Sequence, residues 1–177
     1  MMTRLVFVLC WIALLCGCAP QIPNRVTADE YQIYSAWATA RFAKNPPDHL
    51  YFSGRTGVFD PSHFACGTEL EKSGVSSSLA KQLRALGDAE YSLGLDSPAK
   101  LQIPWNYKQA NASPDLPPGT FHLITFSRVA FNRSHTEALF AVFDACAFDR
   151  CGHGGYIEGI KQNEKWGFRP VGCWILS

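Results

Sequence analysis

Two cysteines and a histidine lie close together near the end of the chain. Cys146 and Cys151 are separated by four residues, and His153 follows in a glycine-rich segment. Thiolate and imidazole groups bind zinc or copper(I), so these residues form one candidate metal site. A fourth ligand would come from one of three residues: His122, His135 or Cys173. Common zinc motifs place two residues between their cysteines, so this spacing favours a disulfide, and we predict no bound metal.

A second candidate group contains the residue types of a hydrolase triad. Ser127 would be the nucleophile, His122 or His135 the general base, and Asp144 the orienting carboxylate. The chain has no G-x-S-x-G turn, and Ser127 falls inside a predicted strand. It also has no P-loop, no G-x-G-x-x-G and no H-E-x-x-H motif. The sequence therefore favours a protein that is not an enzyme, with a hydrolase using Ser127, His122 and Asp144 as the alternative.

The first residues have the pattern of an export signal. Arg4 precedes eleven uncharged residues, Leu5 to Leu15, and this run is too short to span a bilayer. The sequence ending at Cys18 resembles the lipobox of bacterial lipoproteins, although Cys16 stands where Ala or Ser is usual. The resemblance implies a signal peptide over 1–17, a lipid on Cys18 and a tether over 18–26. Because Ala19 is not acidic, it also implies an outer-membrane anchor facing the periplasm.

The remaining 27–177 segment is long enough for one domain with its own core. Without Arg4, fifteen basic residues balance fifteen acidic ones, and no basic patch stands out. This balance argues against nucleic acid as a partner. Aromatic residues make up 13% of the chain, which fits a large aromatic core.

Four cysteines remain after the predicted signal and lipid site: Cys66, Cys146, Cys151 and Cys173. An even number of cysteines in an exported chain indicates disulfides, and four allow three connectivities. Facing positions of a hairpin have about the Cα separation that a disulfide needs, roughly 5.5 Å. We therefore predict a pair between Cys146 and Cys151 across a four-residue turn. The second predicted pair joins Cys66 to Cys173.

The last third of the chain indicates an antiparallel meander. The predicted strands are 121–132, 138–145, 156–161, 166–168 and 171–175, and their connections are too short for parallel crossovers. The capping box Thr27-Ala-Asp-Glu30 predicts a helix that ends before Pro46, and 79–86 is a second helix. The predicted fold class is α+β, with a sheet of four to six strands and two or three helices on one face.

Three further residues are candidates for ligand binding. Trp105 and Tyr107 lie in the proline-rich stretch 88–118, a long connection that could fold back on the sheet as a lid. Arg128 is a charge inside the predicted sheet. It would be the polar anchor of an apolar pocket if the sheet curves under the first helix, or an exposed arginine if it does not.

A series of short motifs resembles a group of bacterial exported proteins and lipoproteins. The series includes Ser127-Arg-Val-Ala-Phe-Asn132, Cys151-Gly-His-Gly-Gly-Tyr156 and the terminal Trp174-Ile175. The group has Gly where this chain has Ala130. The resemblance implies the meander fold and the exported setting, but no particular activity. Our expectation is a non-enzymatic envelope module that binds envelope proteins or a small apolar ligand and uses no cofactor.

Overall fold

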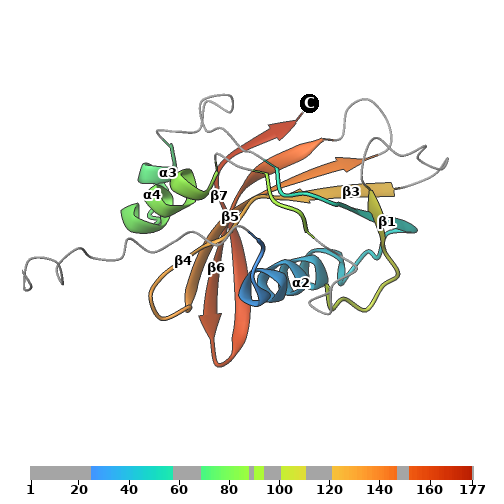
Figure 1. Cartoon of the computed structure of the whole chain (residues 1–177), viewed down its shortest axis with the longest axis horizontal. Helices are drawn as coiled ribbons and strands as arrows, with labels where there is room; N and C mark the ends of the chain where they lie inside the picture. Colours follow the sequence, from blue (N-terminus) through green and yellow to red (C-terminus); the bar gives the residue numbers. More distant parts are fainter. Residues whose placement is uncertain are drawn as a thin grey trace, which may run out of the picture.

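The computed structural model describes residues 25–57, 69–87, 90–93, 101–110, 121–146 and 152–176. Within these residues, seven strands form one sheet with helices packed against it (Figure 1). In chain order, the elements are α2 (Ala28–Phe42), β1 (His49–Ser53), α3 (Glu69–Lys72), α4 (Ser77–Leu86), β2 (Lys108–Ala110), β3 (Phe121–Phe126), β4 (Ala130–Phe131), β5 (Glu137–Cys146), β6 (His153–Gln162) and β7 (Lys165–Leu176). The predicted α+β fold class is confirmed, but the described sheet has seven strands rather than the expected four to six.

The sheet is mostly antiparallel. Its strand order is β2-β1-β3-β5-β6-β7, and β4 also pairs with β5. The strands β5, β6 and β7 form the predicted C-terminal meander through short connections. By contrast, β1 is parallel to both β2 and β3, which places a parallel segment at the opposite end of the sheet.

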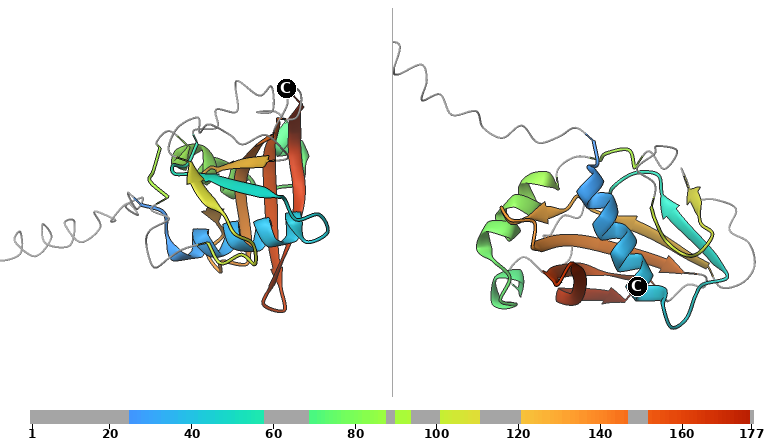
Figure 2. Two further views of the ribbon diagram at one scale, coloured as in Figure 1. Left: turned by 90° about the vertical axis from the view of Figure 1, so that its right-hand side faces the viewer. Right: turned by 90° about the horizontal axis from the view of Figure 1, so that it is seen from below.

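Helices cover both faces of the sheet, so the expectation that they share one face is wrong (Figure 2). Successive side chains of a strand point to opposite faces. In β5, Phe140 and Val142 join the core under α2, whereas Leu139 and Ala141 join the core under α4. Because β5 carries apolar residues at consecutive positions, it needs a cover on each side.

The core under α2 is built from aromatic rings. Phe126 stacks on Tyr34, with ring centroids 4.3 Å apart, and on Phe52 at 5.8 Å. Trp37 meets Phe126 edge-on at 5.6 Å. The Tyr34 hydroxyl donates a hydrogen bond to the Ser127 carbonyl at 2.6 Å, so this fully buried phenol is satisfied. The high aromatic content of the sequence therefore stabilises the contact between α2 and the sheet.

The stretch predicted as one strand over 121–132 is interrupted. It forms β3 and β4 with a break at Ser127, Arg128 and Val129. At the break, the backbone N–H of Ala141 donates to the Ser127 hydroxyl at 2.7 Å, where a regular ladder would use a carbonyl. A side chain thus replaces a backbone acceptor, and the departure from the ladder leaves Arg128 facing α2.

The β6–β7 hairpin extends beyond the rest of the sheet (Figure 1). Its turn residues Asn163 and Glu164 have φ of 49° and 61°, the backbone of a type I′ turn. A Cβ at Gly159 would lie 3.2 Å from Phe168 and 3.3 Å from Trp166, so glycine permits these rings to cover β6. Within the described sheet, β7 is an edge strand, where Pro170 is tolerated because it has no N–H to donate to a ladder.

Candidate functional site

A groove lies between the second half of α2 and the strands β5, β6 and β7. Its volume is about 340 Å³. Nine of the described residues line it: Trp37, Arg41, Val142, Asp144, His153, Ile157, Phe168, Arg169 and Pro170. Five of the nine are apolar. Strand register places Asp144 opposite His153 at one end, so the groove has apolar walls and a polar end.

Asp144 is the most unusual residue in this groove. Its exposed fraction is only 4%, and its Oδ1 is 2.7 Å from His122 Nδ1. Its Oδ2 is buried and has no hydrogen-bond partner among the described residues. The closest charge to Oδ2 is an Arg41 terminal nitrogen at 3.6 Å, which is an ion pair rather than a hydrogen bond. Nearly all buried polar atoms are hydrogen-bonded, so an unsatisfied carboxylate oxygen at a groove marks a site that a ligand can complete.

Three elements position this polar end. Trp37 and Arg41 are four residues apart in α2 and therefore lie on one face of the helix. Register pairs Asp144 of β5 with Ile124 of β3 on one side and with His153 on the other. The His122 ring packs edge-on against Phe42 at 5.1 Å, which helps to hold its Nδ1 toward Asp144. The sheet and helix thus fix the carboxylate from three directions.

Arg128, the predicted pocket anchor, lies elsewhere. It is 3% exposed, and its Nε donates to Glu30 Oε1 at 2.6 Å while a terminal nitrogen donates to Glu30 Oε2 at 3.1 Å. Its guanidinium also stacks over Tyr91 at 4.4 Å. Burial lowers the pKa of Arg128, but the hydrogen bond and charge of Glu30 outweigh burial and raise that pKa above its ordinary value. Arg128 therefore joins α2 to the sheet, and it is neither a groove residue nor an exposed arginine.

Ser127 does not complete a triad with His122 and Asp144. Its hydroxyl donates to the Arg128 carbonyl at 2.7 Å and accepts from the Ala141 N–H. Two backbone partners thus occupy the hydroxyl, and the side chain is 97% buried away from the groove. The structure does bring His122 and Asp144 together. That pair is the orienting half of a triad without the predicted nucleophile.

Trp105 and Tyr107 pack onto the core rather than into the groove. Trp105 meets Phe42 edge-on at 6.2 Å, and Tyr107 meets Phe52 at 5.4 Å. The Tyr107 hydroxyl donates to the Leu101 carbonyl at 3.4 Å. Burial raises the pKa of Tyr107. The part of the long connection around these residues, 101–110, therefore covers the core and supplies β2 at the edge of the sheet.

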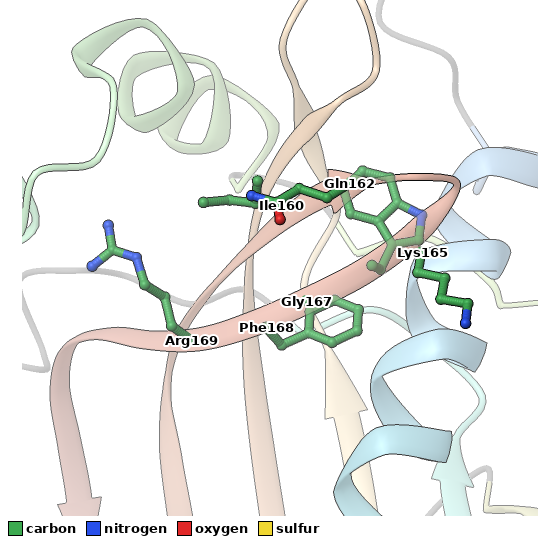
Figure 3. Close-up of a pocket in the computed structure, with 7 residues that line it drawn as sticks. Ile160, Gln162, Lys165, Gly167, Phe168 and Arg169 are labelled. Atoms are coloured by element: carbon green, nitrogen blue, oxygen red, sulfur yellow. The ribbon is translucent and has the colours of Figure 1, made fainter.

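A second hollow, of about 420 Å³, lies on the β6–β7 hairpin (Figure 3). Figure 3 shows Phe168 pointing toward α2, while Arg169 points toward the two short helices. Arg169 hydrogen-bonds to Glu158, and its terminal nitrogens contact the Ser73 carbonyl at 3.4 Å. The Arg169 charge in this hollow is thus paired. Although it is the larger hollow, it lacks the unsatisfied buried group that distinguishes the groove at Asp144.

Several predicted sites lie outside what the structure describes. The predicted signal peptide over 1–17, the lipid site Cys18 and all but the last two residues of the predicted tether over 18–26 fall outside the described ranges, as do Cys66 and Cys151. The strands β5 and β7 include Cys146 and Cys173, but their side chains are not described. Both disulfides stay predictions. Among the described residues, no three His, Cys, Asp or Glu side chains gather as metal ligands. In the same residues, no helix has the length and apolar character needed to cross a membrane.

Comparisons with protein-family models, with curated proteins and with solved structures give no match to this chain. The resemblance of the C-terminal motifs to a group of exported proteins therefore stays a prediction. The site must be judged from its own geometry.

Sequence reasoning named Asp144 and His122 but gave them a hydrolytic role, and it missed Arg41. The signal for Arg41 is weak, since it is one of several polar residues on an aromatic helix. Its spacing from Trp37 places both on one helix face, but only the structure shows that this face meets the ends of β5 and β6.

Proposed function

We propose that this protein is a non-enzymatic binding module of the cell envelope, and that the groove at Asp144 is its binding site. The observation that carries this proposal is the combination in one groove of apolar walls and a buried carboxylate with an unmet hydrogen bond. Binding sites for small ligands combine mainly apolar walls with a few polar groups that fix orientation.

The composition of the groove favours reversible binding over covalent chemistry. Among the described residues, its lining contains no Ser, Cys, Thr or Lys side chain that could act as a nucleophile. The Ser127 hydroxyl is held by backbone groups, and Ser127 is not among the described residues that line the groove. The His122–Asp144 pair alone can orient a polar group, and no hydroxyl, thiol or amine side chain stands among the described residues that line the groove.

The proposed setting is the outer membrane, with the domain facing the periplasm and a lipid on Cys18. Support comes from the charged, apolar and small residues that precede Cys18. We expect Cys18→Ser to release the protein from the membrane fraction. Mass spectrometry of the N-terminal peptide should find acyl chains on Cys18 in the parent protein. A parent chain whose Cys18 carries no lipid would contradict the anchor while leaving the binding site unaffected.

The binding site can be tested with an apolar fluorescent probe, N-phenyl-1-naphthylamine. We expect saturable binding that the substitution Pro170→Trp weakens by at least roughly fivefold, because the indole would occupy the groove. Lys165→Trp is the matched control, since it adds the same side chain to β7 outside the groove lining. Equal binding by both variants would place the apolar site elsewhere and would overturn the proposal.

A further inference from the structure

The unsatisfied Oδ2 of Asp144 indicates that a ligand must present a hydrogen-bond donor. Oδ1 already accepts from His122, whereas Oδ2 has no donor among the described residues. The side chain is more than nine-tenths buried, so bulk water is a poor substitute. Oδ2 is covered in the free protein, so a ligand must displace the partly exposed Arg41 side chain to place an N–H or O–H there. That bond is favourable because it satisfies an unmet buried acceptor.

Arg41 places hydrogen-bond donors beside this unsatisfied acceptor, so a ligand must also present an acceptor. Its guanidinium is 46% exposed, and a terminal nitrogen lies 3.6 Å from Asp144 Oδ2. An arginine carries five N–H donors, and the described contacts of this one are the ion pair with Asp144 and the face of Phe42. The polar end of the groove therefore presents an acceptor and a donor side by side.

Charge then selects among the groups that could bind there. An ammonium group would satisfy Asp144 but would be repelled by Arg41, and a carboxylate would satisfy Arg41 but be repelled by Asp144. A neutral amide avoids both penalties, because it donates through N–H and accepts through its carbonyl oxygen. The polar end thus presents one hydrogen-bond acceptor and one donor, which are the two partners that an amide needs.

The apolar walls complete the description of the ligand. Trp37, Val142 and Ile157 are buried core residues that border the groove, and Phe168 closes it from β7. An aromatic or large aliphatic side chain attached to an amide would place its apolar part along these walls. A peptide residue with such a side chain combines both features.

We propose that the groove binds a peptide segment through one apolar residue. Its side chain lies along Trp37 and Ile157, its main-chain N–H donates to Asp144 Oδ2, and its carbonyl accepts from Arg41. This inference rests on the proposed function, because it assigns a ligand class to the same groove.

The test uses N-acetyl-L-phenylalaninamide as a peptide probe and follows the Trp37 indole N–H signal by two-dimensional NMR of the purified full chain. The matched donor-free probe is the same molecule with its amide nitrogens fully methylated. We expect the methylated probe to bind at least roughly tenfold more weakly. Asp144→Asn should weaken the unmethylated probe by a similar factor, since it replaces the acceptor Oδ2 with an amide nitrogen. Asp29→Asn, at an exposed aspartate of α2, is the control and should change neither affinity.

Two further probes separate the possible failures. Toluene tests the groove without any polar group, and we expect it to shift the Trp37 signal equally in the parent and in Asp144→Asn. Equal binding of the two amide probes, with toluene still bound, would overturn the peptide inference and leave the proposed function. If 3-phenylpropan-1-ol binds more tightly than the amide and depends on Asp144, the ligand is a hydroxyl-bearing amphiphile and the peptide inference is wrong. No Trp37 shift with toluene or the amide would overturn both proposals.

Discussion

Two buried carboxylates lie where α2 meets the sheet, and they accept different numbers of hydrogen bonds. Glu30 is 1% exposed and accepts four hydrogen bonds. Two come from Arg128, one from the Val129 N–H at 3.0 Å and one from the Thr27 N–H at 2.8 Å. Asp144 is 4% exposed and accepts one, from His122. Glu30 belongs to α2 and Asp144 to β5 of the sheet that α2 covers, and both are almost fully buried, so the difference is not one of depth.

Glu30 is a carboxylate that stabilises the fold, whereas Asp144 is a carboxylate that is available for binding. Every acceptor direction of Glu30 that faces the protein is used, and no groove reaches it among those described. Asp144 borders a groove and keeps one oxygen without a donor. A carboxylate whose partners are complete fixes the fold, whereas an incomplete one beside a cavity can be completed by a ligand. Burial alone would not have distinguished them.

The largest effect should follow from breaking the Glu30 cluster. We expect Glu30→Gln to lower the free energy of unfolding by about 3–5 kcal/mol, because it leaves the Arg128 charge buried without its counter-ion. Urea denaturation followed by circular dichroism measures this change. The double variant Glu30→Gln with Arg128→Met also removes the unpaired arginine charge and should recover part of the lost free energy of unfolding. A loss below about 1 kcal/mol for Glu30→Gln would mean that the cluster is not structural.

A second prediction uses the titration of Tyr34, which lies beside this cluster. Burial raises the pKa of Tyr34 well above its ordinary value, and the charge of Glu30 raises it further. The folded protein therefore holds this proton more tightly than the unfolded chain does. Its contribution to stability is complete below about pH 10 and is lost as pH rises toward the folded-state pKa.

The expected loss is about 1.4 kcal/mol per pH unit above pH 10 for this one group. Tyr34→Phe should reduce the slope and cost about 1 kcal/mol at neutral pH through its lost hydrogen bond to Ser127. Tyr31 and Tyr107 also have raised pKa values, so some slope should remain. Urea denaturation between pH 8 and about 11.5 measures both effects. An unchanged slope in Tyr34→Phe would show that the phenol is not held neutral by the fold.

The smallest effect on stability should come from Asp144→Asn. The change weakens the bond to His122, but it also removes a buried charge with an unmet oxygen, so we expect a net change within about 1 kcal/mol. The same urea denaturation used for Glu30→Gln gives this value. A loss as large as that of Glu30→Gln would place Asp144 among the structural charges and would remove the contrast between the two sites.

Part of this fold could be predicted from the sequence, because its signals are local. The capping box at Thr27 and Glu30 marks the start of α2, and both of its hydrogen bonds are present. The β-branched and aromatic runs mark the strands of the meander. What escaped prediction depends on distant partners: Glu30 also binds Arg128, 98 residues away, and this contact coincides with the break between β3 and β4. The parallel pairing of β1 with β3 likewise joins segments 72 residues apart.

Less of the candidate site than of the fold could be predicted from the sequence. Asp144 and His122 are 22 residues apart and meet because β3 pairs with β5, a register that no single motif shows. Arg41 comes from α2, whose packing over the face of β5 that carries Phe140 and Val142 is a long-range contact that no local motif shows. A pattern of residue types named the carboxylate, but only the packing shows which of its oxygens lacks a partner.

The most direct test of the contrast between the two carboxylates is a crystal structure of the protein grown with N-acetyl-L-phenylalaninamide. We expect the phenyl ring in the groove beside Trp37, with an amide N–H within about 3 Å of Asp144 Oδ2 and the Glu30 cluster unchanged. A structure with the probe bound away from the groove, or with Asp144 Oδ2 already bonded to another group of the protein, would contradict it.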